Sequence, residues 1–274
     1  MSSFAIVTTR NLPEAYFLAA FLESRGQRLA LVNLERRPLR QTIRVFTRLG
    51  KRRGLPYLAG LLLGRAFGSR YIAGRDPFPE IDAAAIARLR DAWPHIDAID
   101  PHGPAVRGFV EREKPDYMLL AGAPLLRREL YGLAPRGALN RHLALLPDHR
   151  GSDCPVWMLA LNQPEALGFS IHFVSEKVDA GDIVHRQPVP IVPGEALPDY
   201  LARLQRTAST TFTDVLDRLI DGAPLPRVHQ KTLGIQFPPA TLRTLRRAAR
   251  NYAVLAGAPE GAGRRRRLVR SMHS

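Results

Sequence analysis

The first part of the chain constrains the fold most, because it places a helical segment between two short apolar segments. Phe4–Thr9 and Arg28–Asn33 are rich in residues that favour strands. The run from Pro13 to Leu22 repeats its apolar residues with a helical period and stops before Gly26. Strands joined by a helix lie parallel, and strands that are apolar throughout need cover on both faces. The sequence therefore predicts an α/β fold: a Rossmann-like, open, mostly parallel sheet flanked by helices.

The alternation of strands and helices resumes further along the chain. The fully apolar segment 117–122 follows Lys114-Pro115-Asp116 and predicts a buried strand. Two more strands are expected at 137–142 and 167–174, with helices at 81–92, 105–113 and 155–161. These elements continue the same sheet, so residues 1–193 are predicted to form one α/β domain.

Two segments depart from this alternation. Residues 36–75 are basic, and Pro56 and several glycines interrupt them, so they are predicted to be an insertion or cap that begins with a basic helix. Residues 194–274 are predicted to be a helical and irregular C-terminal extension, with a long amphipathic helix at 197–220 and another at 241–255. The end of the extension, 256–274, is rich in glycine and arginine and is predicted to be disordered.

Charge and cysteine content narrow the classes of function. Forty Lys and Arg against 25 Asp and Glu give a net charge of +15, which favours polyanionic partners such as nucleic acid, an acidic membrane or phosphorylated substrates. A nucleic-acid partner is disfavoured, although the basic tail keeps it open. Cys154 is the single cysteine, so an internal disulfide and a cysteine metal cluster are excluded. The chain has no apolar run long enough to span a membrane and no leader-like start, so a cytoplasmic location is expected.

A group of polar residues lies where a ligand site is expected in such a sheet. Asn140 and His142 are two residues apart at the end of a predicted strand, so their side chains share one face. Ligands bind open α/β sheets at the carboxyl ends of the strands. Taken alone, the pair also fits a capping Asn and a solvated His. Asp179 follows in the sequence VDAGDIV, just after another predicted strand.

Three sequences taken together, NRHLALLPDHRG, GFSIHFV and VDAGDIV, carry a family resemblance. Over about residues 114–192 the chain resembles the catalytic domain of the folate-dependent formyltransferases, which include the glycinamide ribonucleotide, methionyl-tRNA and sugar N-formyltransferases. The resemblance implies a transferase of one-carbon metabolism that moves a formyl group from 10-formyltetrahydrofolate to a primary amine. It also implies that Asn140, His142 and Asp179 are catalytic and that no metal takes part.

Those residue types suit the chemistry. Attack of an amine on a formyl carbonyl creates an oxyanion beside a nitrogen that must lose a proton. Asn140 and a protonated His142 are expected to donate hydrogen bonds to the oxyanion. Asp179 is expected to stabilise the imidazolium and to accept the proton. The resemblance further implies that two loops hold the pterin end of the folate, through Leu120, Gly122, Ala123, Leu125, Leu126, Ser175, Glu176 and Val178.

The acceptor is expected to be a small phosphorylated or nucleotide-linked molecule, with an amino sugar favoured. Arg10, Ser170 and His172 are candidates to contact it. The first strand-to-helix turn, TTRNLP, lacks the glycines that would hold a ribonucleotide phosphate. Few residues follow the long helix, which disfavours methionyl-tRNA. A 10-formyltetrahydrofolate hydrolase and a non-catalytic folate- or nucleic-acid-binding protein remain alternatives, and a homodimer is left open.

The chain departs from the family pattern around Asn140. Arg141 stands where the family is apolar, and Leu143 stands where Pro, Gly or Asn is common. By strand alternation Arg141 is expected to point away from the site, toward solvent or a cofactor carboxylate, or to mark a less buried strand. Cys154 is expected to be a packing residue, and His149 a solvated loop residue.

Overall fold

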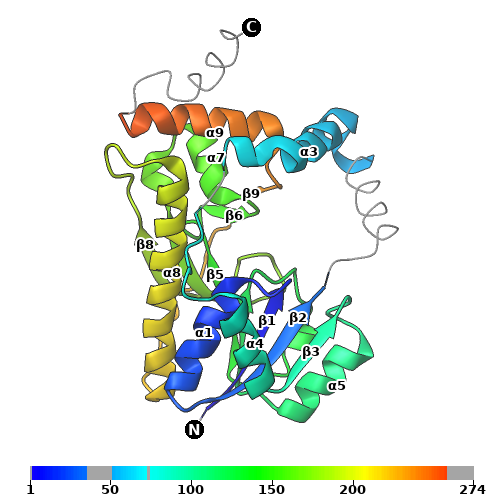
Figure 1. The fold of residues 1–274 in the computed structure, drawn as a ribbon. Helices are drawn as coiled ribbons and strands as arrows, with labels where there is room; N and C mark the ends of the chain where they lie inside the picture. Colours follow the sequence, from blue (N-terminus) through cyan, green and yellow to red (C-terminus); the bar gives the residue numbers. More distant parts are fainter. Residues whose placement is uncertain (1, 36–50, 73–74, 258–274) are drawn as a thin grey trace, which may run out of the picture.

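Seven strands form a mixed, open sheet in the computed structural model, which describes residues 2–35, 51–72 and 75–257 (Figure 1). Their order across the sheet is β3-β2-β1-β4-β5-β7-β8. The first five in this order are parallel, and β7 and β8 are antiparallel additions at one edge. The strands are β1 (Ser3–Thr9), β2 (Arg28–Leu34), β3 (His95–Ala98), β4 (Tyr117–Ala121), β5 (Gly137–His142), β7 (Gly168–Phe173) and β8 (Ile183–Pro188). The predicted fold class is confirmed.

Each face of the sheet has its own hydrophobic core. Successive residues of a strand alternate between the two, as Ile6 and Val7 of β1 do. One core lies under α5 and the short α6. The other lies under α1, α4 and α8 and continues to α7 and α9, so it joins residues on both sides of position 193. The helices are α1 (Pro13–Ser24), α4 (Ala83–Ala92), α5 (Pro104–Glu113), α6 (Arg128–Tyr131), α7 (Cys154–Leu161), α8 (Leu197–Ile220) and α9 (Leu242–Leu255). The domain boundary at 193 stays a prediction.

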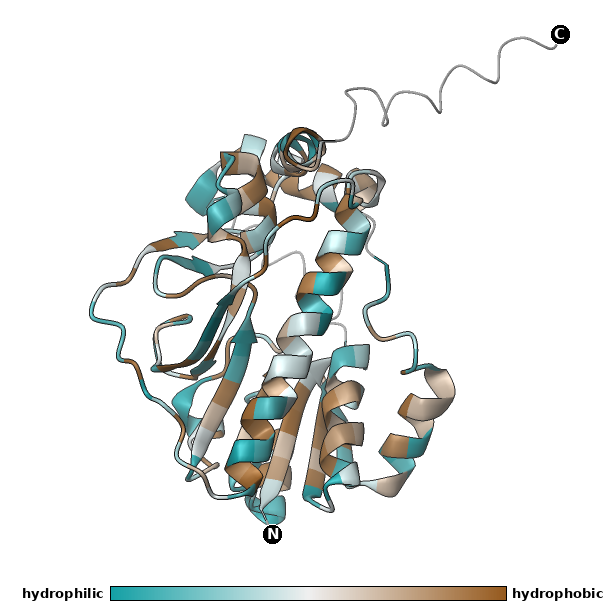
Figure 2. Ribbon diagram, turned by 90° about the vertical axis from the view of Figure 1, so that its left-hand side faces the viewer, coloured by the Kyte–Doolittle hydropathy of each residue, from teal (hydrophilic) through white to brown (hydrophobic). Residues whose placement is uncertain are grey.

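Helix α8 confirms the expected amphipathic pattern. Tyr200, Leu204 and Phe212 are fully buried on one side, and Figure 2 shows polar and apolar residues alternating along the helix. The buried Tyr200 hydroxyl donates a hydrogen bond to the carbonyl of Val189, so the helix is fixed to the segment that follows β8. This contact satisfies a polar group that burial would otherwise leave without a partner.

The segment expected to be an insertion or cap contains a helix, α3 (Leu55–Phe67), followed by the short 3₁₀ turn η1 (Gly68–Arg70). The glycines that argued against a strand here, Gly60, Gly64 and Gly68, lie four residues apart and face α9. A Cβ atom at Gly64 would come within 3.1 Å of the Leu242 nitrogen, so the glycines allow the two helices to pack closely. The predicted basic helix before α3 falls mostly on residues 36–50, outside the described residues.

A second, two-stranded sheet joins the C-terminal part of the chain to the loop after β5. Strands β6 (His149–Gly151) and β9 (Ile235–Phe237) pair in parallel. Gly151 has a φ of +93°, and a Cβ atom there would lie 2.3 Å from the Phe237 carbonyl oxygen. The proline-containing segment after α8 therefore folds back onto the sheet. Across the described ranges, no helix has the length and apolar character needed to cross a bilayer. The predicted disordered tail falls on residues 258–274, also outside the described residues.

Candidate active site

Strand β5 lies where the sheet changes from parallel to antiparallel, and it carries Asn140 and His142. Asn140 pairs with Leu120 of β4 on one side and with His172 of β7 on the other. This register brings the Asn140 amide nitrogen within 3.2 Å of His172 Nε2. The structure thus places the predicted Asn140 and His172 side by side at the carboxyl end of β4 and β5, where open α/β sheets bind ligands.

Asp179 joins them from the loop before β8. Its carboxylate accepts a hydrogen bond of 2.9 Å from the Gly151 backbone N–H. The same group lies 3.6 Å from His142 Nδ1 and 3.6 Å from His172 Nε2. The three predicted catalytic residues therefore meet, and His172 completes the cluster.

The backbone around Asp179 is held by residues remote in sequence. Asp179 has a φ of +49°, in the left-handed region that is costly for a residue other than glycine. The Arg150 guanidinium donates to the Val178 carbonyl at 2.8 Å. The Gln230 amide donates to the carbonyls of Asp179 and Gly181. Gln230 follows α8, so the C-terminal part of the chain helps to hold the catalytic loop.

Two opposing effects set the charge of Asp179. Burial raises its pKa. His172, His142 and the Gly151 N–H together lower the pKa by more than burial raises it, so the pKa of Asp179 is below the ordinary value. The group is therefore ionised at neutral pH.

His142 is almost completely buried behind Asp179. Burial is the largest effect on its pKa and lowers it; Asp179 acts in the opposite direction but does not compensate. The ring is thus neutral at pH 7, so the protonated His142 expected to assist the oxyanion would have to form during the reaction. Its Nε2 lies 3.1 Å from the His149 carbonyl and its Nδ1 faces Asp179, so both ring nitrogens have an acceptor oxygen ready if the ring takes up a proton.

Cys154 also contacts His142, with 3.6 Å between Sγ and Nε2. Burial raises the pKa of this thiol to about 12, so it is protonated and packs as a small apolar group, as expected.

The hydrogen-bonding of His172 favours one tautomer. Its Nδ1 lies 2.8 Å from the Phe173 carbonyl and therefore carries the proton, while Nε2 accepts from Asn140.

A cavity of about 860 Å³ opens at this cluster. Asn140, His172 and Asp179 line it, whereas His142 does not. Six of the eight residues expected to hold the folate also line it: Leu120, Ala123, Leu125, Leu126, Ser175 and Val178. Such a volume is typical of a cavity for a cofactor-sized ligand.

The other predicted site residues lie elsewhere. Gly122 forms a turn with a φ of +67°, against Leu12, and the exposed Glu176 lies 3.5 Å from Arg128. Ser170 is fully buried, donates to the Ala144 carbonyl and accepts from the Leu146 N–H, so it holds the loop after β5. Arg10 is exposed and does not line the cavity.

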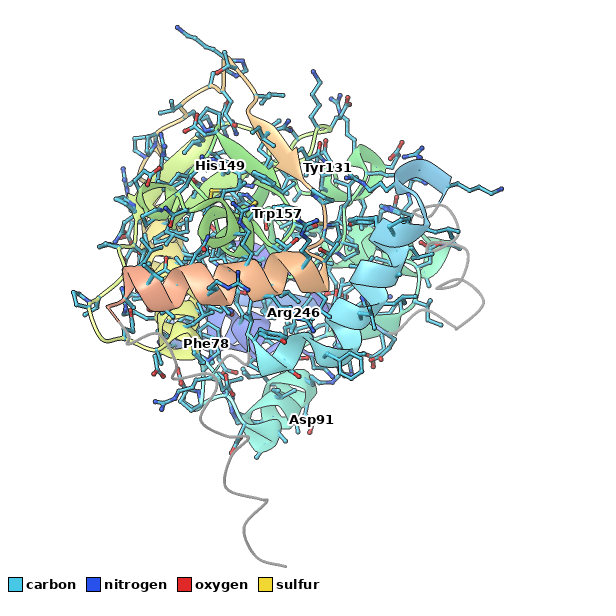
Figure 3. All side chains as sticks on the ribbon, turned by 90° about the horizontal axis from the view of Figure 1, so that it is seen from above. Phe78, Asp91, Tyr131, His149, Trp157 and Arg246 are labelled. Carbon is cyan, nitrogen blue, oxygen red and sulfur yellow. The ribbon has the colours of Figure 1, made fainter. Side chains whose placement is uncertain are left out.

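Part of the cavity wall comes from two segments in which no individual site residue was predicted. Arg52 and Arg53, before α3, and the segment Gln236–Pro239 line it. Phe237 stacks between the rings of His149 and Trp157, both labelled in Figure 3. His149 is therefore packed and not a freely solvated loop residue. The pairing of β6 with β9 joins segments far apart in sequence, and the local sequence QFPP (236–239) has no pattern that predicts it.

Arg141 points away from the site, as strand alternation predicted, but neither toward solvent nor toward a cofactor. Its guanidinium forms a two-pronged ion pair with Glu14 of α1, and the Ser209 hydroxyl of α8 donates to the same carboxylate. Both charged side chains are about nine-tenths buried. The charge of Arg141 is therefore paired within the protein, and the alternative of a strand less buried than in relatives stays a prediction.

Comparisons with known proteins show which family and fold the chain is similar to. Residues 86–216 match the family model described as formyl transferase. The methionyl-tRNA formyltransferase of Chlorobium chlorochromatii (strain CaD3) is 32% identical over 139 residues, which make up 51% of this chain and 43% of that protein. The chain spans about half the length of the curated relatives it matches.

Solved structures share the fold over a greater length. A sugar N-formyltransferase from Shewanella sp FDAARGOS_354 superposes with a TM-score of 0.56 at 13% identity, over 91% of this chain and 87% of that one. The formyltransferase PseJ from Anoxybacillus kamchatkensis, in complex with UDP-4,6-dideoxy-4-formamido-L-AltNAc and tetrahydrofolate, gives 0.52 at 13% identity, over 93% and 98%. At these identities the structures support the fold alone.

Proposed function

Because residues 86–216 belong to the formyl transferase family, we propose that this chain transfers a formyl group from 10-formyltetrahydrofolate to a primary amine of a small, nucleotide-linked amino sugar. The observation that carries the proposal is the meeting of Asn140, His172 and Asp179 on one wall of a ligand-sized cavity, with His142 behind them. These residues come from β5, β7 and the loop before β8, all within the segment that matches the family.

The cavity fits the donor chemically. Leu120, Leu126 and Val178 supply apolar walls for a flat ring, and backbone groups of the same loops can form hydrogen bonds to its edge. The bound folate would supply the activated formyl group. Asn140 lines the cavity and uses one amide N–H on His172, so its second N–H is available to donate to the formyl oxygen as negative charge develops there.

Asp179 is placed to accept the proton that the attacking amine loses. It is ionised, it lines the cavity, and it lies between two imidazoles. A proton that arrives on Asp179 can be shared with His142, because His142 Nδ1 lies 3.6 Å from Oδ2 of that carboxylate. The imidazolium so formed would keep the His149 carbonyl as its second acceptor. His172 holds the Asn140 amide and so orients the donor to the oxyanion.

The charge of the cavity favours an anionic ligand. Arg52, Arg53 and Lys177 line it, and Asp179 is the single acidic residue among the described residues that do so. Both a phosphorylated acceptor and the carboxylates of a folate tail match this excess of positive charge. Two proteins that share this fold, a sugar N-formyltransferase and a formyltransferase that holds a UDP-linked formamido sugar, make an amino sugar the first acceptor to test.

Methionyl-tRNA is the second candidate acceptor, because the curated relatives, at 32% identity and below, are named methionyl-tRNA formyltransferases.

The purified chain should be incubated with 10-formyltetrahydrofolate in separate reactions that contain a UDP- or dTDP-linked amino sugar, methionyl-tRNA or no acceptor. Mass spectrometry of the acceptor and absorbance of tetrahydrofolate then report transfer.

We expect the amino sugar to be formylated. The Asp179→Asn variant should give no formylated product, and a chelator should leave the wild-type rate unchanged. Formylated methionyl-tRNA would replace the proposed acceptor. Tetrahydrofolate released equally without any acceptor would indicate a hydrolase. Activity that requires zinc would contradict the proposed chemistry.

A further inference from the structure

Helix α3 presents its apolar side chains outward. Leu55, Leu62 and Leu63 are 77%, 47% and 46% exposed. With Ala59 and Ala66, also exposed, they recur at the spacing of one helix face. The opposite face carries Gly60, Gly64 and Gly68, which pack against Thr241, Leu242 and Leu245 of α9. Leu61 is buried, but three of the five leucines of this helix lie outward, whereas large apolar residues usually face inward.

The surroundings of this face are cationic. Lys51, Arg52 and Arg53 precede α3. On the adjoining α9, exposed Arg243, Arg246, Arg247 and Arg250 follow one another along the helix, and Figure 3 shows Arg246 on the end of the molecule where α3 and α9 lie together. The sequence has no acidic residue between Glu35 and Asp76 or between Asp221 and Glu260. Both helices therefore belong to stretches free of negative charge.

The length of α3 suits a surface and not a span. Thirteen residues of helix extend about 20 Å, against about 30 Å for the hydrocarbon core of a bilayer. A short apolar stripe with cationic neighbours is the arrangement by which helices bind the interface of anionic membranes. Contiguous exposed leucines on a protein surface commonly mark an interaction site.

Other occupants fit less well. A symmetric contact between two copies would bring together two surfaces whose exposed charges on α9 are arginines. An RNA would match the charge, but leucine side chains offer no aromatic faces on which bases stack and no hydrogen bonds to phosphates. An anionic lipid surface matches both the charge and the aliphatic stripe.

We propose that α3 and the adjoining α9 dock this protein on the surface of an anionic lipid bilayer. Leu55, Leu62 and Leu63 enter the boundary between headgroups and acyl chains, and the arginines of α9 lie near the headgroups. Arg52 and Arg53 also line the active-site cavity, so the docked surface adjoins the cavity wall. The inference stands on the α3 surface and does not depend on the proposed acceptor.

The test is flotation of the full chain with vesicles of phosphatidylcholine alone or with 30 mol% phosphatidylglycerol, at low and high salt. We expect binding to the anionic vesicles only, weakened as salt screens the charges. Leu62→Ser together with Leu63→Ser should lower the bound fraction at least about tenfold. Ile99→Ser, which removes an exposed apolar side chain outside α3 and α9, is the matched control and should bind like the wild type.

A second variant keeps the proposal testable if the leucine changes disturb folding, which circular dichroism would show. Changing Arg243, Arg247 and Arg250 to Ser should weaken binding to anionic vesicles to a similar degree. No flotation of the wild type, or equal loss by Ile99→Ser, would overturn the proposal. A dimer that sedimentation velocity detects in the wild type but not in the leucine variant would also overturn it. So would tight binding of RNA that the leucine variant retains.

Discussion

Asp179 is the residue on which the site depends most, because its carboxylate meets two imidazoles and a backbone N–H while its own carbonyl is held by Gln230. We predict that Asp179→Asn, Asn140→Ala and His142→Ala each lower kcat/KM at least about a hundredfold without unfolding the chain. His185→Asn, a change outside the cavity, is the control. The assignment fails if all three variants keep more than a tenth of the activity.

His142 should make stability depend on pH. Its pKa is lower in the folded chain than the ordinary value of about 6.5, so the folded state resists protonation more than the unfolded state does. The stability that this gives is present above about pH 6.5 and is lost as the pH falls through the lowered pKa. The slope for one group reaches at most about 1.4 kcal/mol per pH unit. Asp179 acts with the same sign at lower pH.

The measurement is urea unfolding of the wild type and of His142→Asn between pH 7.5 and 5.5. We expect the free energy of unfolding of the wild type to fall more steeply with acid than that of the variant. Parallel curves would show that His142 is protonated equally in the two states.

At the level of elements, the ion pair between Arg141 and Glu14 ties β5 to α1, and Ser209 adds α8. Breaking a buried pair leaves an uncompensated charge, so Arg141→Met should cost about 3 to 5 kcal/mol of unfolding free energy. Arg141→Met combined with Glu14→Gln should recover most of that loss. Chemical denaturation of the three proteins checks this, and a double variant as unstable as the single one would contradict it.

The β6–β9 pair makes a separate prediction. A Cβ atom at Gly234 would lie 2.0 Å from the Asp148 carbonyl oxygen, so Gly234→Ala must displace β9. Because β9 leads into the cavity wall, transfer should fall by about tenfold or more and the melting temperature should drop. Gly108→Ala is the control, because nothing lies within 4 Å of the added Cβ atom there and its φ, like that of Gly234, is not in the left-handed region. Equal activity of Gly234→Ala and the wild type would show that β9 does not shape the site.

At the scale of the whole molecule, much of the fold follows from local pattern. The strands β1, β2, β4, β5 and β7 and the helices α8 and α9 were predicted from apolar periodicity, which a buried strand or an amphipathic helix carries in its own residues. Helix α3 was not predicted as such, because its glycines serve packing against α9, a partner some 180 residues further along. Strands β3, β6 and β9 are short, and their pairing is set by distant segments.

The same distinction applies to the site. Asn140, His142 and Asp179 could be named from spacing and family resemblance, and they do meet. The burial that makes His142 neutral, and the contribution of Arg52 and Gln236–Pro239 to the cavity, depend on tertiary packing. A chain ending at Gly257 keeps all of these groups, so we predict a transfer rate within about threefold of the full chain. If the truncated chain folds and binds folate but does not transfer the formyl group, the removed residues contribute to the acceptor site.

The buried pair of Glu14 and Arg141 also has an evolutionary consequence. The two positions are 127 residues apart, yet neither charge is tolerable without the other in a site nine-tenths closed to water. Lineages that carry an apolar residue at the position of Arg141 should therefore carry an uncharged residue at the position of Glu14. Intermediates with only one of the two charges should be rare, so the pair is expected to be gained or lost as a unit.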